Sequence, residues 1–224
     1  MKKESEHRKY HNSSGEEVPS VTTVLKIYGK DLTGWANWLG FQGIKVKPYV
    51  MERANYGTYI HSLAERYFTG DLSVLMNDHK FLNDVEYEGF IKRFDYLSSL
   101  LYSKGFEVYR CELVLEGKRC GGTLDIIFYN KELNKYLLLD FKTSKAIQKS
   151  MYIQLGGYTK LLKEVCDIDV FAVGIILITK EVTDPSFSNI MSAKDNEKNV
   201  QIFDKLLDIY YLLDAQDKEL LKGD

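Results

Sequence analysis

The stretch of the chain that most constrains its fold runs from Tyr136 to Lys145 and reads YLLLDFKTSK. Its three consecutive leucines form an apolar run that is too short for a core helix, so the run predicts a buried β-strand. Side chains alternate across a strand, and Asp140 and Lys142 therefore emerge on one face while Phe141 points to the other. A carboxylate and an ammonium at the end of a sheet can hold a cation and position or deprotonate an attacking water, which is the chemistry of metal-dependent phosphodiester hydrolysis.

An acid and a lysine separated by one residue form a weak motif when taken alone. The pattern occurs three times, at Asp78-His79-Lys80, Glu116-Gly117-Lys118 and Asp140-Phe141-Lys142. Only the third ends a strongly apolar strand. Whether Asp140-Phe141-Lys142 marks a functional site therefore depends on the other motifs of the sequence.

The segments around this strand predict a mixed β-sheet. Strands are predicted at 106–116, 121–129 and 135–141, and the short turns between them favour an antiparallel meander. A helix over 148–165 leads to a further strand over 170–179, and a helical crossover of this kind makes two strands parallel. The sequence thus predicts an α/β (α+β) fold in which helices flank a central sheet.

Helical periodicity and turn residues predict the remaining elements. Long helices are expected over 52–68, 80–104 and 194–221, with a loop over 184–192. Near the start, residues 10–18 are typical of a small hairpin, and Ser20 is expected to cap a short helix.

We expect a single domain over residues 1–224. A chain of 224 residues buries about 70% of its unfolded surface, which is enough for one substantial core. The expected parts are an N-terminal hairpin and helical appendage (1–50), a catalytic core (51–180) and a C-terminal helix (194–221).

Composition excludes several classes of site and partner. The three cysteines, Cys111, Cys120 and Cys166, include no CxxC pair, which argues against a disulfide framework and against a zinc or iron–sulfur site. The start lacks an apolar signal segment, and the longest hydrophobic run, 170–178, is too short to cross a bilayer. We therefore expect a cytoplasmic protein with no membrane partner. The net charge of −2 excludes a generally basic binder but is compatible with a local basic groove for nucleic acid.

Asp125 is an acid in the middle of an apolar strand, GGTLDIIFY. A buried carboxylate is costly unless it is paired or bound to a cation. Antiparallel neighbouring strands can bring Asp125 close to Asp140, where two like charges at ~4 Å repel by roughly 4 kcal/mol. A divalent cation turns this repulsion into binding.

Two helices carry polar pairs at a spacing of one turn. His61 and Glu65 share a face of the helix over 52–68, although a lone histidine more often has a structural role. Gln154 and Tyr158 share a face of the predicted helix over 148–165. Gly156 and Gly157 each cost that helix about 1 kcal/mol relative to alanine, which indicates close approach by another backbone or a ligand.

Trp35, Trp38 and Phe41 stand at helical spacing, just before Lys45 and Lys47. Aromatic residues three apart on a helix are usually buried, so core packing is the first interpretation. The alternative is a platform on which unpaired bases stack beside a basic strip.

Four short motifs follow one another along half of the chain, from Gly57 to Tyr158. They are Gly57-Thr58-Tyr59-Ile60-His61 with Glu65, Gly122-Thr123-Leu124-Asp125, Asp140-Phe141-Lys142, and Gln154 with Tyr158. In this order the chain resembles the RecB-like branch of the PD-(D/E)xK nuclease superfamily. The segment PSVTTVL near the start is similar to compact phage and mitochondrial-genome-maintenance exonucleases of that branch. Leu124 stands where the superfamily's eponymous proline would be, and the four-cysteine cluster of some relatives is absent.

The resemblance implies a restriction-endonuclease-like core and a metal-dependent DNA exonuclease that acts on DNA ends, in particular single-stranded ones, in replication, repair or recombination. It implies Mg²⁺ or Mn²⁺ as cofactor, ligated by His61, Asp125, Asp140 and the carbonyl of Phe141, with Lys142 as the catalytic lysine. Oxygen ligands with one imidazole suit these ions better than zinc. Gln154 and Tyr158 would steady the site or touch DNA.

The alternatives are a structure-specific endonuclease of the same chemistry and a catalytically silent DNA-binding module. The implied setting is a bacterial or phage-infected cell, with a replication or recombination protein as a possible partner. Glu112 could bind the cation through water, support a ligand, or pair with Arg110 or Lys118. Lys145 and Lys149 are expected to contact phosphates by their position, or else to form a solvated helix start.

Overall fold

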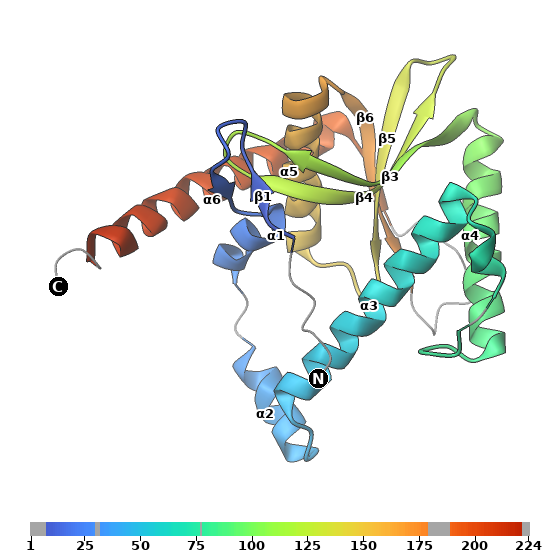
Figure 1. Cartoon of the computed structure of the whole chain (residues 1–224), viewed down its shortest axis with the longest axis horizontal. Helices are drawn as coiled ribbons and strands as arrows, with labels where there is room; N and C mark the ends of the chain where they lie inside the picture. Colours follow the sequence, from blue (N-terminus) through green and yellow to red (C-terminus); the bar gives the residue numbers. More distant parts are fainter. Residues whose placement is uncertain (1–7, 30–31, 77, 179–188, 221–224) are drawn as a thin grey trace.

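A five-stranded mixed sheet with helices on both faces forms the centre of the computed structural model (Figure 1). The structure describes residues 8–29, 32–76, 78–178 and 189–220. The strands are β1 (Tyr10–His11), β2 (Glu17–Val18), β3 (Phe106–Glu116), β4 (Gly121–Asn130), β5 (Lys135–Lys142), β6 (Val170–Leu177) and β7 (Asn189–Ser192). The helices are α1 (Val21–Val24), α2 (Thr33–Phe41), α3 (Val46–Thr69), α4 (Asp84–Tyr102), α5 (Lys149–Cys166) and α6 (Ala193–Leu220), with short 3₁₀ helices at Leu25–Tyr28 and Leu72–Leu75.

The sheet order is β3-β4-β5-β6-β7. The first three strands are antiparallel, β6 is parallel to β5 and is reached through α5, and β7 closes the far edge antiparallel to β6. The predicted fold class, a central mixed sheet with an antiparallel meander flanked by helices, is therefore confirmed. Within the described part of the chain, no helix is both long and apolar enough to cross a membrane.

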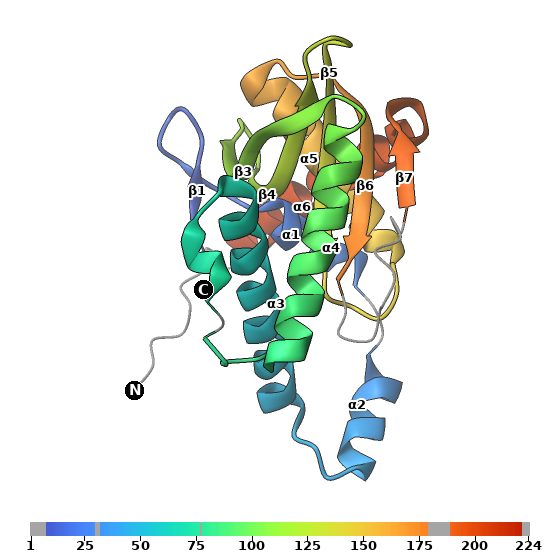
Figure 2. The same ribbon diagram turned by 90° about the vertical axis from the view of Figure 1, so that its right-hand side faces the viewer.

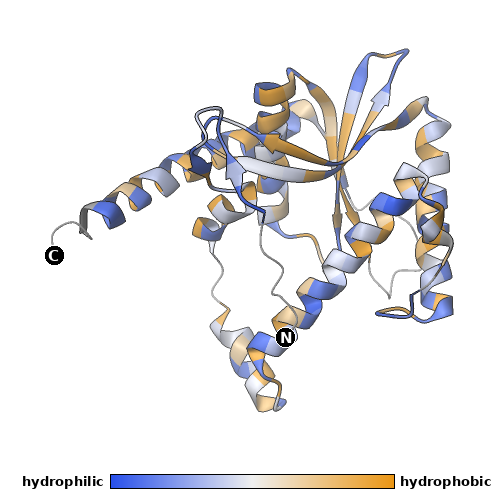
Figure 3. Ribbon diagram, viewed as in Figure 1, coloured by the Kyte–Doolittle hydropathy of each residue, from blue (hydrophilic) through white to orange (hydrophobic). Residues whose placement is uncertain are grey.

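Side-chain alternation along β5 divides the core into two layers. Leu137, Leu139 and Phe141 face α3 and α4, whereas Leu138 faces α1, α5 and α6. Figure 2 shows α3 and α4 side by side over one face of the sheet, and Figure 3 shows the sheet as the most hydrophobic part of the chain. Burial on both faces explains why this strand is an uninterrupted apolar run.

The prediction of a loop over 184–192 was wrong for its last four residues, which form β7; residues 184–188 lie outside the described part, as do the predicted ends at Thr179 and Leu221. β7 is a short edge strand whose side chains are mostly exposed, so it lacks the alternation by which a strand is recognised.

The starts of two helices also differ from the prediction. α3 begins at Val46 because Pro48 is tolerated in a first turn, and α4 begins at Asp84 because Asn83 and Glu86 form a capping box.

Core packing was the wrong interpretation for the aromatic residues of α2. Trp38 and Phe41 are 55% and 89% exposed, and Leu39 is the residue of this helix that is buried. Trp35 is half-buried against Tyr49 at the start of α3. Helical spacing shows which residues share a face, but α2 projects away from the sheet and that face meets no core (Figure 1).

The glycine pair of α5 admits a neighbouring helix, as the sequence indicated. A Cβ at Gly156 would lie 2.6 Å from the backbone oxygen of Asn199, and one at Gly157 would lie 2.9 Å from the ring of Phe203, both on α6. The close partner is thus the backbone of α6 at Gly156 and a side chain of α6 at Gly157, rather than a ligand.

We predict that Gly156→Ala destabilises the protein by about 1–3 kcal/mol, because the added methyl group meets rigid backbone of α6. The matched control is Gly89→Ala in α4, where nothing lies within 4 Å of the added atom. That variant should be neutral or more stable by up to about 1 kcal/mol, from helix propensity alone. Urea unfolding measures both. Equal effects of the two substitutions would show that the α5–α6 contact is not tight.

Candidate active site

The backbone hydrogen bonds between β4 and β5 end at the pair Ile126–Leu139. Beyond this pair β4 continues beside β3 as far as Gly121, and β5 continues beside β6 as far as Lys142. The next residues on the two strands are Asp125 and Asp140. The sheet thus divides at the two acids, and the Phe141 N–H donates to Asp125 Oδ2 at 2.6 Å instead of to a backbone carbonyl.

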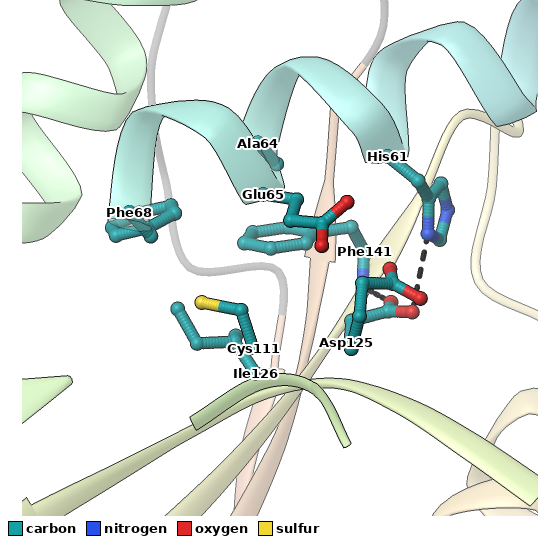
Figure 4. Close-up of a pocket in the computed structure, with 9 residues that line it drawn as sticks. His61, Ala64, Glu65, Phe68, Cys111, Asp125, Ile126 and Phe141 are labelled. Carbon is teal, nitrogen blue, oxygen red and sulfur yellow. Dashed lines mark hydrogen bonds and ion pairs between the residues drawn. The ribbon is translucent and has the colours of Figure 1, made fainter. Parts of the chain in front are cut away.

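His61 reaches this division from α3. Its Nδ1 lies 3.1 Å from Asp125 Oδ1, as the dashed line in Figure 4 marks. Gly57, one turn earlier, faces the connection after β5, where an added Cβ would make an ordinary contact of 3.5 Å with Thr143 Oγ1. Three elements therefore meet at Asp125.

His61 and Asp125 stabilise each other's charge. Burial alone would lower the pKa of His61, but the charge and hydrogen bond of Asp125 outweigh it and raise this pKa to about 9. Burial would likewise raise the pKa of Asp125, but His61 outweighs it and holds that pKa below its usual value. In the metal-free protein the two groups form an imidazolium–carboxylate pair.

Asp140 and Lys142 form a second pair on β5. The Lys142 Nζ lies 2.5 Å from Asp140 Oδ2, and Asp140 is only 1% exposed. Burial raises the pKa of Asp140 to about 6, against the attraction of Lys142. Burial opposes the charge of Lys142 as well, but Asp140 and Asp125 outweigh it and raise the pKa of the ammonium. Lys142 is therefore held as a charged amine beside the acids.

The donor atoms at this position fit a divalent cation. His61, Glu112 and Asp125 each offer one ligand atom, and these atoms all lie within 4.8 Å of one another. An imidazole with two carboxylates is a donor set that Mg²⁺ or Mn²⁺ accepts. Asp140 does not belong to this group and pairs with Lys142 instead.

Three other predicted site residues, Glu65, Phe141 and Glu112, line the small pocket beside His61 and Asp125. Glu65 is exposed and lines a small pocket together with His61 and Phe68 (Figure 4). The side chain of Phe141 packs in the core, stacked on Phe68, so its backbone alone faces the site. Glu112 lies in the pocket wall on β3.

Gln154 and Tyr158 pack on the face of the sheet away from α3, toward which Asp140 and Lys142 also point by strand alternation, and Gln154 Nε2 donates to the Tyr158 hydroxyl at 3.1 Å. Burial, together with the negative charges of Asp140 and Asp125, raises the pKa of Tyr158 well above its usual range. A Cβ at Gly122 would lie 2.8 Å from the Tyr158 ring, so this glycine admits the tyrosine. The pair supports the strands that carry the acids.

Four further residues are not brought into this centre. Lys145 is exposed in the connection after β5, and Lys149 is the exposed first residue of α5. Trp35 and Trp38 lie on α2, below the start of α3 (Figure 1).

Sequence reasoning missed Tyr10, whose hydroxyl is hydrogen-bonded to Thr123 Oγ1 at 3.0 Å and whose ring covers Gly121. The paired glycines at 121 and 122 were the available indication that a bulky group approaches there. This contact joins the N-terminal hairpin to the strand that carries Asp125.

We predict that the metal-free protein loses stability as the pH rises from about 6.5 through about 9. The pKa of His61 is higher in the folded than in the unfolded chain, so its contribution is complete below the unfolded value and disappears above the folded one. Thermal unfolding with chelator present, compared between wild type and His61→Gln, measures this. The stability advantage of the wild type should shrink across this range. A constant difference would contradict the imidazolium–carboxylate pair.

Comparisons with known proteins show little beyond this geometry. No protein-family model matches the chain, and no curated protein is significantly similar to it. Among solved structures, the chain is similar to the protein of "Crystal structure of SSO0001" over 66% of its own length and 74% of that chain, with 12% identity and a TM-score of 0.27. A TM-score this low carries no argument about fold or activity.

Proposed function

We propose that the protein is a metal-dependent deoxyribonuclease of the PD-(D/E)xK type, an exonuclease that hydrolyses phosphodiester bonds at single-stranded DNA ends. The observation that carries the proposal is the convergence of an imidazole, two buried acids and an amine from three separate elements at the division of the sheet. These groups are His61 on α3, Asp125 on β4, and Asp140 with Lys142 on β5. The order of motifs along the chain supports the same assignment.

His61, Asp125 and Asp140 would hold Mg²⁺ or Mn²⁺, with the Phe141 carbonyl as a further ligand. When bound, such an ion lowers the pKa of a coordinated water and stabilises negative charge at phosphorus. Lys142, fixed by Asp140, can donate to a phosphate oxygen or orient the attacking water. Gln154 and Tyr158 keep β4 and β5 in place from the other face.

DNA would approach along the end of β5. Lys145 and Lys149 lie just beyond Lys142, and Lys149 begins α5, whose first backbone N–H groups favour anions. Contacts of this kind bind the backbone without reading sequence. In a cell, such an enzyme would trim DNA ends in replication, repair or recombination, in the cytoplasm of a bacterium or a phage-infected host.

The preference for single strands rests on the projecting α2. Trp38 and Phe41 are exposed there. Lys45 stands directly before α3, and Lys47 lies in its first turn. Exposed aromatic rings beside cations can stack unpaired bases while the cations contact the backbone. A duplex offers no free base faces and gains little from such a surface.

We predict that Asp140→Asn and Lys142→Ala each reduce cleavage of end-labelled single-stranded DNA by about a hundredfold or more. The first removes a proposed cation ligand, and the second removes the amine that would donate to the phosphate or orient the water. The assay supplies Mg²⁺ or Mn²⁺ in turn. Lys163→Ala is the matched control, since Lys163 lies on exposed α5 surface and pairs with Asp167 and Asp169. Near-normal cleavage by both site variants would refute the nuclease assignment. A covalently closed single-stranded circle tests the mode of attack, because only an endonuclease can open it.

We predict that Trp38→Ala and Phe41→Ala weaken binding of single-stranded DNA by about 1–3 kcal/mol each, since each removes one stacking ring. Duplex binding should change little. Tyr96→Ala, which removes a half-exposed ring from α4, is the control. Fluorescence anisotropy with catalytically inactive Lys142→Ala protein measures these affinities without cleavage. Equal losses for single-stranded and duplex DNA would contradict base stacking on α2.

A further inference from the structure

Glu112 stands directly across the sheet from Asp125. The cross-strand pairs on either side are Cys111–Ile126 and Leu113–Leu124, which leaves Glu112 and Asp125 opposite each other. Like charges in this position repel and destabilise a sheet. An acid pair therefore requires a compensating group at this point.

The backbone turns the Glu112 side chain toward α3. Glu112 adopts a left-handed conformation with φ of 46°, which is uncommon for a residue other than glycine. Strict alternation would place Cys111 and Glu112 on opposite faces, yet both line the pocket that contains His61. This local irregularity directs the carboxylate to the side of the sheet where the imidazole lies.

The Glu112 carboxylate has no hydrogen-bond or ion-pair partner among the residues that the structure describes. The two neighbouring acids differ in this respect, since Asp125 accepts from His61 and Phe141, and Asp140 pairs with Lys142. The candidate partners of Glu112 on its own strand are occupied elsewhere. The Arg110 guanidinium lies over the Tyr109 ring and donates to the Tyr109 carbonyl oxygen.

We propose that Glu112 is a direct ligand of the catalytic cation, together with His61 and Asp125. One donor atom from each lies within 4.8 Å of the others, and two carboxylates with one imidazole neutralise a divalent ion. Asp140 lies outside this group and pairs with Lys142 in the metal-free structure, so Glu112 completes the donor set beside His61 and Asp125. The inference rests on the proposed function, because it concerns the same site, and it adds a ligand from β3 that the motifs do not include.

Binding of Mn²⁺ to the chelator-treated full chain tests the proposal by calorimetry, without reference to activity. Glu112→Gln should weaken binding by about a hundredfold or more, since loss of even an outer partner of a ligand costs 10–100-fold. Glu107→Gln, an exposed acid on the same strand, should bind as the wild type does. Glu112→Gln should melt at or above the wild-type temperature when metal-free, which excludes unfolding as the cause.

A second measurement separates direct ligation from a long-range effect of charge. Glu112→Cys should give a thiolate-to-metal absorption band when Cd²⁺ is added, because soft thiolates bind this ion directly. Wild type and Glu107→Cys should not give the additional band. Absence of the band, or Mn²⁺ affinity unchanged in Glu112→Gln while Asp125→Asn abolishes binding, would overturn the role of Glu112 alone. Unchanged binding in Asp125→Asn as well would overturn the metal site and the proposed function together.

Discussion

The site depends on a division of the sheet between β4 and β5. Up to the pair Ile126–Leu139 the two strands exchange backbone hydrogen bonds, and beyond it they do not. Polar groups buried at such a division need other partners, because an unpaired charge in a protein interior is costly. Side chains supply them: Asp125 accepts from the Phe141 amide and from His61, and Asp140 pairs with Lys142. These charged side chains therefore take the place of the backbone hydrogen bonds that β4 and β5 do not form beyond Ile126–Leu139. The same groups can bind a cation.

Close packing on both faces keeps this division in place. On one face α3 lies across the strands with His61 directed at Asp125, and on the other Tyr158 fits against Gly122. Gly156 admits α6 to the back of α5, so the helix that carries Tyr158 is itself held from behind. Gly122 and Gly156 thus allow contacts that larger side chains would prevent, and both contacts support the strands that carry the acids.

Local patterns predicted the fold, while tertiary contacts determined what was missed. The short turns between the strands were sufficient to predict the meander, and the cost of an acid inside β4 indicated that Asp125 needs a partner, which in the structure is His61. β7 was missed because an edge strand with exposed side chains has no alternation. The exposure of Trp38 was missed because helical spacing does not report what packs on a face. The left-handed backbone at Glu112 has no sequence signature of its own, since the residue is not a glycine.

α3 connects the projecting end of the molecule to the charged centre without interruption. It runs from Val46 to Thr69, and its first turn, where Tyr49 contacts Trp35 of α2, is about 22 Å from His61 at 1.5 Å per residue. A continuous helix bends only gently, so it moves largely as a rigid rod. A displacement of the start of α3 would therefore tilt the imidazole against Asp125. The position of α2 and the strength of the ion pair are thus mechanically coupled through one helix.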